Sequence, residues 1–379
     1  MSSGQPGRVR TALDRAAEYM LDATVLERIG IAAAATGAAL LIGVFAVIGT
    51  GHSPVTFLNE LVWGAFGDQR RLSRTLQFMT LYVLAGVAVA VAFRAGVFNI
   101  GVQGQLIFGG AACVFAIVSI APVLPENAIV GVLLIVIGTI AAAIGGGLYG
   151  ALPGVLKAYY GANEIITTIM LNFIAIGFIG WAIDSGPLRD PDAGTVRTEF
   201  LPDHVSPLPS PVFGDSNFSI FVLIFALIVV ALTAVLMART RFGYDMVTSG
   251  YQASAATFSG VDAKRTIVAT MTLSGMIAGV VGAVLAIMIQ GRFIDPGNIH
   301  TYGFDAIAVS LLAANNPIGV VPAGLLFGAL DAGGSNVQLQ TDIPVQLIDG
   351  IVGLVVLFVA VPELFRMAAN RTGLGGETP

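Results

Sequence analysis

The sequence predicts an all-α protein that crosses a membrane many times. Only 11% of its 379 residues are charged and 56% are hydrophobic, whereas soluble globular domains carry roughly 25% charged residues. The apolar residues also form long runs, such as 31–49 and 220–238. Each run is close to the ~20 residues with which a helix spans a hydrocarbon core of ~30 Å. This composition excludes an ordinary soluble enzyme.

The predicted spans are separated by charges, prolines and glycine clusters that interrupt the hydropathy. About ten spans result, near 30–49, 76–93, 103–122, 128–156, 164–183, 218–238, 264–290, 303–315, 317–333 and 345–362. The eighth and ninth are short, and only Asn315-Asn316-Pro317 separates them. They are either two full crossings or one re-entrant hairpin, and hydropathy alone does not decide between these.

The basic residues predict which side of the membrane each end of the chain occupies. With the N-terminus inside, twelve of the 18 Lys and Arg residues fall on the cytoplasmic side and six on the other. Because basic residues concentrate in cytoplasmic loops, both termini are predicted to be cytoplasmic. The cluster Arg70, Arg71 and Arg74 lies on the predicted outer side and argues the other way. The first residues lack the pattern of a cleavable secretory signal, so the first apolar run is expected to remain as a helix.

Three parts follow one another along the chain. A membrane domain is predicted over 30–365, between a cytoplasmic segment, 1–29, and a cytoplasmic tail, 366–379. The first segment has the apolar spacing of an amphipathic helix on the inner membrane surface, with a frayed tail as the alternative. Residues 185–217 form a long polar loop with six prolines, which parity places outside. Residues 239–263 form the longest cytoplasmic loop.

The composition also limits the chemistry available to the chain. It has a single cysteine, Cys113, so neither an internal disulfide nor a multi-cysteine metal cluster is possible. Its three histidines lie near the ends of apolar runs, which does not indicate a metal site. The sequence contains no Gly-x-x-x-x-Gly-Lys-Ser/Thr phosphate loop and no nucleophile–base pair. No catalytic site and no directly bound cofactor are therefore expected.

A polar, glycine-rich stretch follows the second span. Three glycines occur within residues 96–104, together with amide side chains. In a membrane, irregular backbone of this kind is tolerated only where it is buried in protein or lines a water-filled cavity. The stretch is therefore predicted to line a solute pathway; the alternative is a tight loop at the cytoplasmic edge, anchored by Arg94. The candidate residues are Phe98, Asn99, Gln103 and Gln105.

A second polar group recurs every four residues on one apolar helix. Glu164, Thr168 and Asn172 form a stripe that should face the bundle interior, where it could bind a polar solute. The alternative is that these residues only hydrogen-bond neighbouring helices, for well under ~2 kcal/mol each. Asn172 is the better solute contact, because a carboxylate in the first turn already suits the helix dipole. The adjacent Phe173 joins the candidates, and Asp305, at the outer end of the eighth span, is a candidate helix cap.

The loop 239–263 is predicted to contain a short helix that membrane crossing does not require. Its alanines favour helix, and Gly250 and Gly260 are predicted to mark the helix ends. A short cytoplasmic helix suits docking into a groove of a partner protein. The candidate docking residues are Gly250, Tyr251, Gln252, Ala253, Ala255, Ala256 and Gly260.

Four stretches together resemble the permease subunits of ABC importers in the ribose, branched-chain amino acid and nucleoside group. They are residues 96–105 (GVFNIGVQGQ), 163–172 (NEIITTIMLN), the loop 243–261 and 303–312 (GFDAIAVSLL). The resemblance covers roughly residues 30–365. The stretch 163–172 is the most specific of the four and looks most like the nucleoside branch.

The resemblance implies a transport subunit of a prokaryotic cell membrane, without catalytic chemistry of its own and without a nucleic acid partner. In such importers two permease chains, often different ones in the nucleoside branch, form the pore. Cytoplasmic ATPases hydrolyse the ATP, and an extracytoplasmic or lipid-anchored binding protein delivers the solute. The coupling helix of the family, which contacts the ATPase, corresponds to residues 250–260. Family members usually carry Glu at the position of Gln103, so a role that needs a carboxylate there does not carry over to an amide.

Two other transport functions remain open. Thr168 and Asn172 would serve a simple sugar or an amino acid as well as a nucleoside, although Phe98 and Phe173 would suit a nucleobase, which stacks on aromatic rings. An ion-coupled secondary transporter would need ionisable groups deep in the bundle, and the middle of nearly every predicted span has none. An ABC importer of nucleosides is therefore the leading hypothesis.

Overall fold

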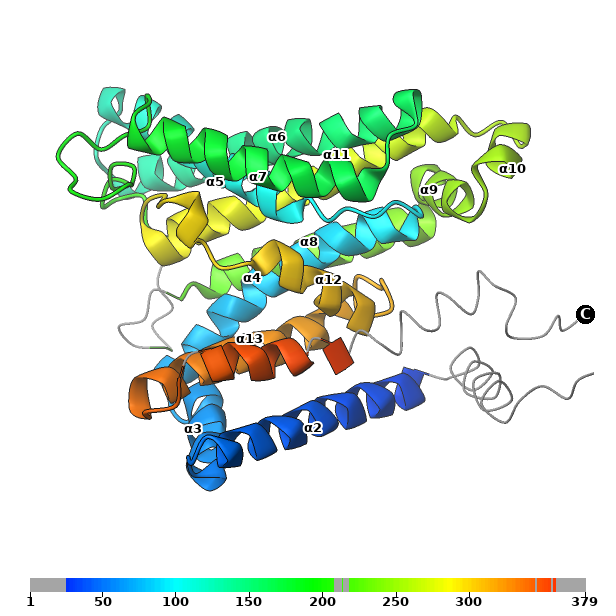
Figure 1. Cartoon of the computed structure of the whole chain (residues 1–379). Coiled ribbons are helices and arrows are strands. Elements are labelled where there is room, and N and C mark those ends of the chain that lie inside the picture. Colours follow the sequence, from blue (N-terminus) through cyan, green and yellow to red (C-terminus); the bar gives the residue numbers. More distant parts are fainter. Residues whose placement is uncertain (1–24, 208–212, 214–217, 345, 356, 359–379) are drawn as a thin grey trace, which may run out of the picture. The chain divides into compact units, whose positions relative to one another are not determined.

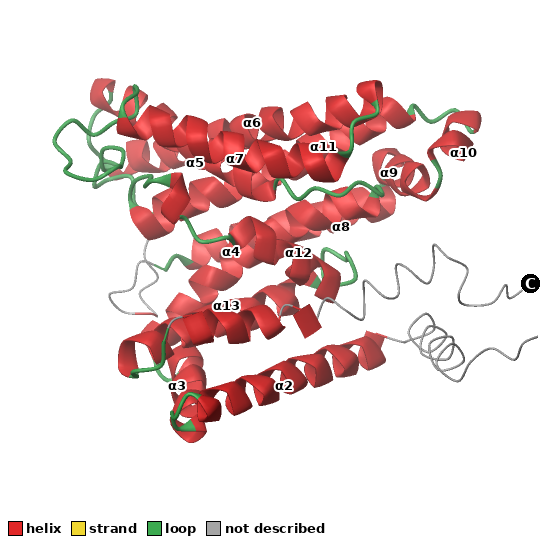
Figure 2. Cartoon of the chain, in the orientation of Figure 1, coloured by secondary structure: helices red, strands yellow, loops and turns green. Residues whose placement is uncertain are grey.

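The computed structural model describes residues 25–207, 213, 218–344, 346–355 and 357–358, and these are mostly helical. Figure 2 shows helices joined by loops, and the β pairing in the described part is one isolated bridge between Arg197 and Ile294. The prediction of an all-α fold is confirmed. Residues 1–24 of the predicted amphipathic segment and the whole predicted tail, 366–379, lie outside the described residues.

Six helices of the described part are long and apolar enough to cross a membrane. They are α4 (Gln69–Arg94), α5 (Val102–Ile120), α6 (Ala128–Tyr160), α7 (Glu164–Asp184), α8 (Ile220–Arg239) and α11 (Ala263–Val284). A 3-10 turn, η1 (Ala121–Val123), continues α5, and a π-helix, η3 (Leu285–Gln290), continues α11. Each of the six coincides with one of the predicted spans from the second to the seventh. The chain is therefore a multi-pass membrane protein.

Further helices lie at the other predicted spans. They are α2 (Val25–Gly49), α12 (Tyr302–Leu312), α13 (Val320–Gln340) and Gln346–Val355. With 11 residues, α12 is about 16 Å long at ~1.5 Å per residue, too short for a hydrocarbon core of ~30 Å. The eighth predicted span is therefore not a full crossing by itself.

The chain forms two compact units, one of residues 62–333 and one that combines 1–61 with 334–379. In the second unit, most of α3 (Pro54–Phe66) and the end of α13 contribute to a small apolar core. Asn336 of α13 donates 2.9 Å hydrogen bonds to the backbone carbonyl and the carboxylate of Glu60. The core residues are Val47, Phe57, Leu61, Val337, Ile343, Ile348 and Ile351.

Within the unit 62–333, α11 packs against α4, α5 and α6, and α7 lies beside α5 and α6 (Figure 1). Glycines let α6 and α11 approach closely. A Cβ atom on Gly146 would lie 2.6 Å from the Cα of Gly279, and one on Gly150 would lie 3.0 Å from the Cα of Gly275. Gly146 and Gly150 are four residues apart on α6, and Gly275 and Gly279 are four residues apart on α11. Small residues at this spacing let helix backbones pack in contact, so these positions hold the bundle together.

The two ends of the unit 62–333 carry different elements. The loop that follows α7 and the 3-10 turn η4 (Pro296–Asn298) lie at one end. The short helices α9 (Arg241–Tyr251) and α10 (Ala253–Phe258) lie at the opposite end, beside the turn between α6 and α7 (Figure 1). The loops predicted to lie on opposite sides of the membrane thus lie at opposite ends of the bundle.

Candidate substrate pathway and coupling segment

The chain is irregular between the end of α4 and the start of α5. Gly96 begins this segment with a left-handed φ of 68°. Asn99 is buried, and its amide exchanges two hydrogen bonds with the amide of Gln105, at 2.9 and 3.0 Å. Asn99 Nδ2 also donates to Ser274 Oγ of α11 at 2.8 Å. The irregular backbone is therefore held inside the protein, which is where a membrane bundle tolerates it.

The polar stripe of α7 fastens this segment to α5. Asn172 Oδ1 accepts the N–H of Gly104 at 2.8 Å, and its Nδ2 donates to the carbonyl of Ile100 at 2.9 Å. Gly101, the N-cap of α5, has no side chain to cap the helix, so Asn172 supplies the acceptor that a first-turn N–H needs. Thr168 is also buried, and its hydroxyl donates to the carbonyl one turn earlier in α7 at 2.6 Å. The two polar groups predicted from the sequence thus meet in the structure.

The start of α5 also meets the start of α12. Gln103 Oε1 accepts the N–H of Gly303 at 2.8 Å, and its Nε2 donates to the carbonyl of His300 at 3.2 Å. A Cβ atom on Gly303 would overlap the backbone of Gln103, so the two helix starts are in contact. An ionised Glu accepts hydrogen bonds and donates none, whereas an amide does both. Gln103 therefore suits both partners at this position, where the family that the sequence resembles usually carries Glu.

Two short helices form the predicted cytoplasmic loop. Gln252 separates α9 from α10 with an extended backbone, φ −159° and ψ 104°, and Gly260, with a left-handed φ of 86°, follows the end of α10. The expected helix end at Gly260 therefore agrees with the structure to within two residues. The expected start at Gly250 is wrong, since this residue lies within α9 and the helix break comes at Gln252.

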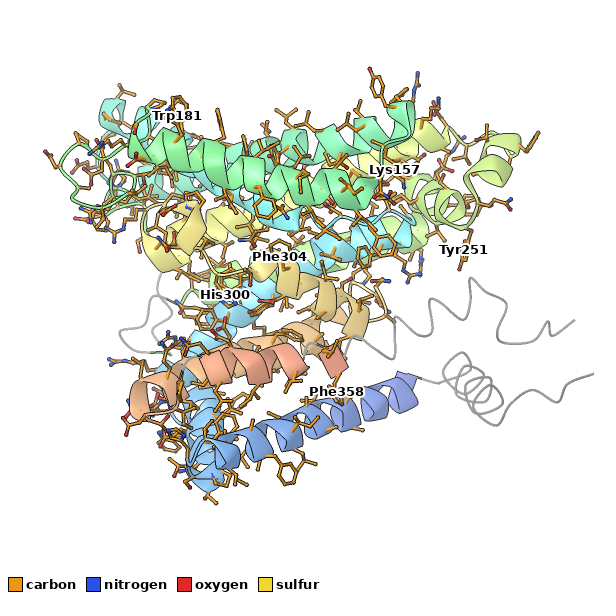
Figure 3. All side chains as sticks on the ribbon, in the orientation of Figure 1. Lys157, Trp181, Tyr251, His300, Phe304 and Phe358 are labelled. Carbon is orange, nitrogen blue, oxygen red and sulfur yellow. The ribbon has the colours of Figure 1, made fainter. Side chains whose placement is uncertain are left out.

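Aromatic side chains project from these two helices. Tyr251 is 88% exposed and Phe258 is 95% exposed, and Figure 3 shows Tyr251 at the end of the bundle that carries α9. Gln252, between them, is exposed as well. The other predicted docking residues are Ala256, which is buried, and Ala253 and Ala255, which lie in α10.

A backbone contact joins α9 to the irregular segment. A Cβ atom on Gly250 would lie 2.6 Å from the carbonyl carbon of Ala95, and one on Gly96 would lie 2.7 Å from the carbonyl oxygen of Gly250. These distances are shorter than Cβ contacts in proteins, so neither position accommodates a side chain without a shift of backbone. The backbone of α9 is therefore in direct contact with the turn at Gly96.

Comparison with known proteins identifies the family. A family model for the permease component of branched-chain amino acid transport systems matches residues 71–360, which is most of the chain and includes the irregular segment, α7, α9 and α12. The chain belongs to this permease family. Its role is therefore transport across a membrane.

Three relatives of the permease are named as ABC transporter permease proteins. It is 32% identical to the guanosine ABC transporter permease protein NupP of Bacillus subtilis over 332 residues. The matched region covers 88% of this chain and 93% of NupP. It is 30% identical to the nucleoside ABC transporter permease protein NupB of Lactococcus lactis, over 86% of this chain and 89% of NupB. It is also 30% identical to the glucose ABC transporter permease protein TsgB13 of Haloferax volcanii, over 87% and 86%.

The permease contains a third polar group, which the sequence did not reveal. Tyr82 of α4, His300, Asp305 of α12 and Asp331 of α13 meet and are called the Tyr82 cluster below. The Tyr82 hydroxyl lies 3.2 Å from His300 Nε2, 3.3 Å from Asp331 Oδ2 and 3.5 Å from Asp305 Oδ2. His300 Nε2 lies 3.1 Å from Asp305 Oδ2. Figure 3 marks His300 at the level where α4 and α12 lie side by side.

Aromatic rings surround the Tyr82 cluster. The ring of Tyr302 lies 5.4 Å from that of Tyr82, and the ring of Phe327 lies 5.7 Å from it, both edge to face. Asp305, considered as a helix cap from the sequence, contributes its carboxylate to this group instead. Tyr82 and Asp331 are 249 positions apart in the chain, so no local pattern of the sequence relates them. The one sequence signal that could have pointed to this group was the lone acidic residue Asp331 inside a predicted span.

The two aromatic pathway candidates of the permease lie in different surroundings. Phe98 is partly buried and packs edge to face on Phe93, with 5.0 Å between the ring centroids. Phe173 is 64% exposed on α7 and lies outside the buried stripe of Thr168 and Asn172. The structure therefore brings Phe98, and not Phe173, together with the irregular segment.

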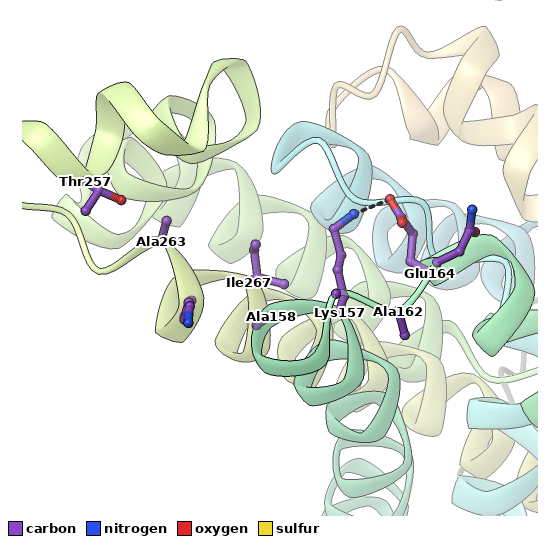
Figure 4. A pocket seen from close by; sticks show the side chains of 10 residues that line it. Lys157, Ala158, Ala162, Glu164, Thr257, Ala263 and Ile267 are labelled. Atoms are coloured by element: carbon purple, nitrogen blue, oxygen red, sulfur yellow. Dashed lines mark ion pairs between the residues drawn. The ribbon is translucent and has the colours of Figure 1, made fainter.

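Glu164, the first residue of α7, forms an ion pair with Lys157 of α6. The pair lies at the edge of a cavity of about 620 Å³, which Figure 4 shows at the turn between α6 and α7. Thr257 of α10 and Ile267 of α11 line the same cavity. Glu164 is therefore engaged in an ion pair at the end of the permease that carries α10.

Proposed function

We propose that this permease is the membrane-spanning subunit of an ATP-driven ABC importer of nucleosides. The observation that carries the proposal is the 32% identity to a guanosine permease, which extends over 93% of that relative. The family model, which matches residues 71–360, supports it as well.

The proposed pathway follows the joint of α5, α7 and α12. The amides of Asn99, Gln105 and Asn172 hold its backbone through the hydrogen bonds described above, and Gln103 connects it to α12. The pathway candidates remain Phe98, Asn99, Gln103, Gln105, Thr168, Asn172 and Phe173. Because Phe173 is exposed on the single chain, its part in the pathway requires a second permease against α7.

The proposed link to the energy source is the pair α9 and α10. We expect the docking residues, Gly250 to Gly260, to contact a cytoplasmic ATPase through the exposed Tyr251, Gln252 and Phe258. Because Gly250 touches the turn at Gly96, movement of the ATPase would reach the irregular segment through one backbone contact. The permease itself would bind no cofactor, and its partner would hydrolyse the ATP.

The proposed assembly lies in the cell membrane of a prokaryote. It would contain a second permease, expected to be a different chain, and an extracytoplasmic or lipid-anchored binding protein. In this arrangement the membrane domain, 30–365, contains about ten membrane segments, of which the one at α12 does not cross by itself, and 1–29 and 366–379 lie in the cytoplasm. The loop 185–217 would then face the binding protein.

Uptake of labelled guanosine and uridine by cells that produce the permease with its native partners tests this function. We expect uptake that unlabelled guanosine inhibits and excess ribose does not. Depletion of ATP with the ion gradients intact should abolish it, whereas an ion-coupled carrier would continue. Uptake of glucose and not of nucleosides would favour the second candidate function, a sugar importer, which the 30% identity to TsgB13 supports.

A further inference from the structure

The cavity at the turn between α6 and α7 lies where membrane helices leave the hydrocarbon core. Two of the residues that line it are Lys157 and Lys264. Lys157 directly follows the long apolar run of α6, and Lys264 stands shortly before the apolar run of α11. Both helices are long and apolar enough to cross a membrane. Lysines at the ends of such helices extend their charge into the interface, so the cavity lies at the level of the lipid headgroups.

The lining of the cavity carries one more positive than negative charge. Lys157 is neutralised by its ion pair with Glu164. Lys264 is exposed, and its ammonium lies over the ring of Tyr159, 5.5 Å from the centroid. Within the part of the chain that the structure describes, Lys264 forms no ion pair with a carboxylate. One phosphodiester group would balance the charge that remains.

The cavity also has the room and the donors that a phosphate headgroup needs. Its volume of about 620 Å³ lies within the range of about 300–1,000 Å³ that is usual for small-molecule sites. Asn163 lines it and caps α7 through Oδ1, at 2.9 and 3.2 Å from two backbone nitrogens, so its side-chain nitrogen can donate to a ligand. Figure 4 shows apolar side chains beside the ion pair. These apolar lining residues are Ala158, Ala162, Ala263 and Ile267.

A lipid can reach the cavity along the surface of α6. Leu148, Leu152 and Leu156 are exposed and follow one another every four residues, which places them on one face of the helix. This leucine row ends one residue before Lys157. Tyr159, just beyond, is exposed as well, and tyrosines are typical of the membrane–water interface. Acyl chains that lie along the leucine row would bring their headgroup to the cavity.

We propose that this cavity binds the headgroup of an anionic phospholipid, with its phosphate on Lys264 and its acyl chains along the leucine row of α6. Basic pockets between membrane helices are a known means of binding anionic headgroups. A soluble phosphate shares the phosphate chemistry but leaves the leucine row unused, and for this reason the lipid is favoured.

The site also touches the proposed docking segment. Thr257 of α10 lines the cavity together with residues of α6 and α11. A bound lipid would therefore hold α10 against these two helices and strengthen the coupling of ATP hydrolysis to transport. This effect rests on the proposed function, whereas binding of the lipid requires only that the permease lies in a membrane.

Lipid binding by the assembled importer tests the first part of the proposal. The purified complex in detergent is titrated with phosphatidylglycerol or phosphatidylcholine, and bound lipid is measured by native mass spectrometry. We expect phosphatidylglycerol to bind more tightly than phosphatidylcholine. Lys264→Gln should lower the affinity for phosphatidylglycerol roughly fivefold, the effect of one basic residue near a lipid surface.

Two further variants accompany Lys264→Gln. Arg265→Gln removes the same charge at the next residue, which pairs with Asp262 and does not line the cavity, and should leave the affinity unchanged. Ala158→Leu fills the cavity without changing its charge, and should lower the affinity as well. Co-purification with the ATPase establishes that each variant is assembled.

Activity in vesicles tests the effect on coupling. The importer is placed in phosphatidylcholine vesicles with or without phosphatidylglycerol, and guanosine uptake and ATP hydrolysis are measured together. Phosphatidylglycerol should lower the ATP hydrolysed per guanosine several-fold for the unmodified importer and for Arg265→Gln. It should have little effect on Lys264→Gln.

Equal loss of phosphatidylglycerol binding in Lys264→Gln and Arg265→Gln would overturn the proposal, since it would indicate a general attraction to a basic surface. Displacement of the lipid by inorganic phosphate would overturn it in favour of a soluble phosphate. No preference for phosphatidylglycerol in the unmodified complex would overturn it as well, and would leave the cavity for a side chain of the ATPase. Selective binding that depends on Lys264, in an importer that takes up no nucleoside, would support the lipid site and contradict the proposed function.

Discussion

Gln103 and Gly303 join the starts of two helices: the side-chain oxygen of Gln103 in α5 accepts the backbone N–H of Gly303 in α12 at 2.8 Å. The same amide donates to the carbonyl of His300. Gly303 approaches so closely that a Cβ atom there would overlap the Gln103 backbone. This contact connects the irregular segment after α4 with the Tyr82 cluster, so one side chain lies between the two polar regions of the bundle.

Replacement of Gln103 by Glu tests this joint. An ionised Glu keeps the acceptor for Gly303 but loses the donor to His300 and places a charge in a buried position, which costs roughly 1–3 kcal/mol or more. We expect guanosine uptake to fall at least tenfold at neutral pH. A protonated carboxyl both donates and accepts, so uptake by this variant should recover as the pH is lowered.

Measurement of initial uptake rates between neutral and mildly acidic pH checks this prediction. Gln340→Glu, which makes the same change at an exposed position of α13, is the control and should behave like the unmodified protein. A Gln103→Glu permease that transports normally at neutral pH would show that the donor to His300 is dispensable.

Asn172→Ala should destabilise the permease. The substitution leaves the N–H of Gly104 and the carbonyl of Ile100 without their partner in a buried place, and each unsatisfied group costs roughly 1–3 kcal/mol. Thermal unfolding of the purified protein in detergent measures the effect. Asn298→Ala, at an exposed position of η4, removes an amide of the same kind and should leave the unfolding temperature almost unchanged. Equal unfolding temperatures for the two variants would contradict the capping role of Asn172.

Gly250→Ala should uncouple ATP hydrolysis from transport. The added Cβ would lie 2.6 Å from the carbonyl carbon of Ala95, so α9 or the turn at Gly96 must move. We expect ATPase activity of the assembled complex to persist while guanosine uptake falls at least tenfold. Gly180→Ala in α7, where nothing lies within 4 Å of the new atom, is the control. Normal guanosine uptake by the assembled Gly250→Ala complex would refute the coupling role.

Tyr251→Ala should weaken the attachment of the ATPase without affecting the fold of the permease. Tyr251 is almost fully exposed, so its removal leaves no cavity, and aromatic anchors often contribute much of the binding energy of an interface. Co-purification of the ATPase with tagged permease should fall about tenfold. Trp181 is an exposed aromatic residue near the end of α7 that lies away from α9 and α10, so a Trp181→Ala permease should retain the ATPase. Unchanged co-purification and transport in Tyr251→Ala would count heavily against α9 and α10 as the docking segment.

The sequence by itself predicted the parts of this protein that depend on local pattern. Runs of apolar residues identified the membrane class and six helices that the structure contains, because about 20 apolar residues suffice for a helix in lipid whatever its neighbours. The four-residue spacing of Thr168 and Asn172 predicted a buried stripe on α7, and the glycines around Asn99 predicted a break in the helices. Helix ends near Gly250 were less well predicted, because the break at Gln252 depends on backbone geometry that glycine content does not specify.

Tertiary structure alone decided which of these parts meet. Gln103 and Gly303 are 200 positions apart, and Tyr82 and Asp331 are 249 positions apart, so no local period relates them. Asn172 caps α5 only because close helix packing brings α7 against Gly104. Hydropathy and periodicity describe the surroundings of one helix, whereas the choice of partner depends on how whole helix surfaces fit and satisfy each other's polar groups. For that reason the joint and the Tyr82 cluster became visible only in the folded chain.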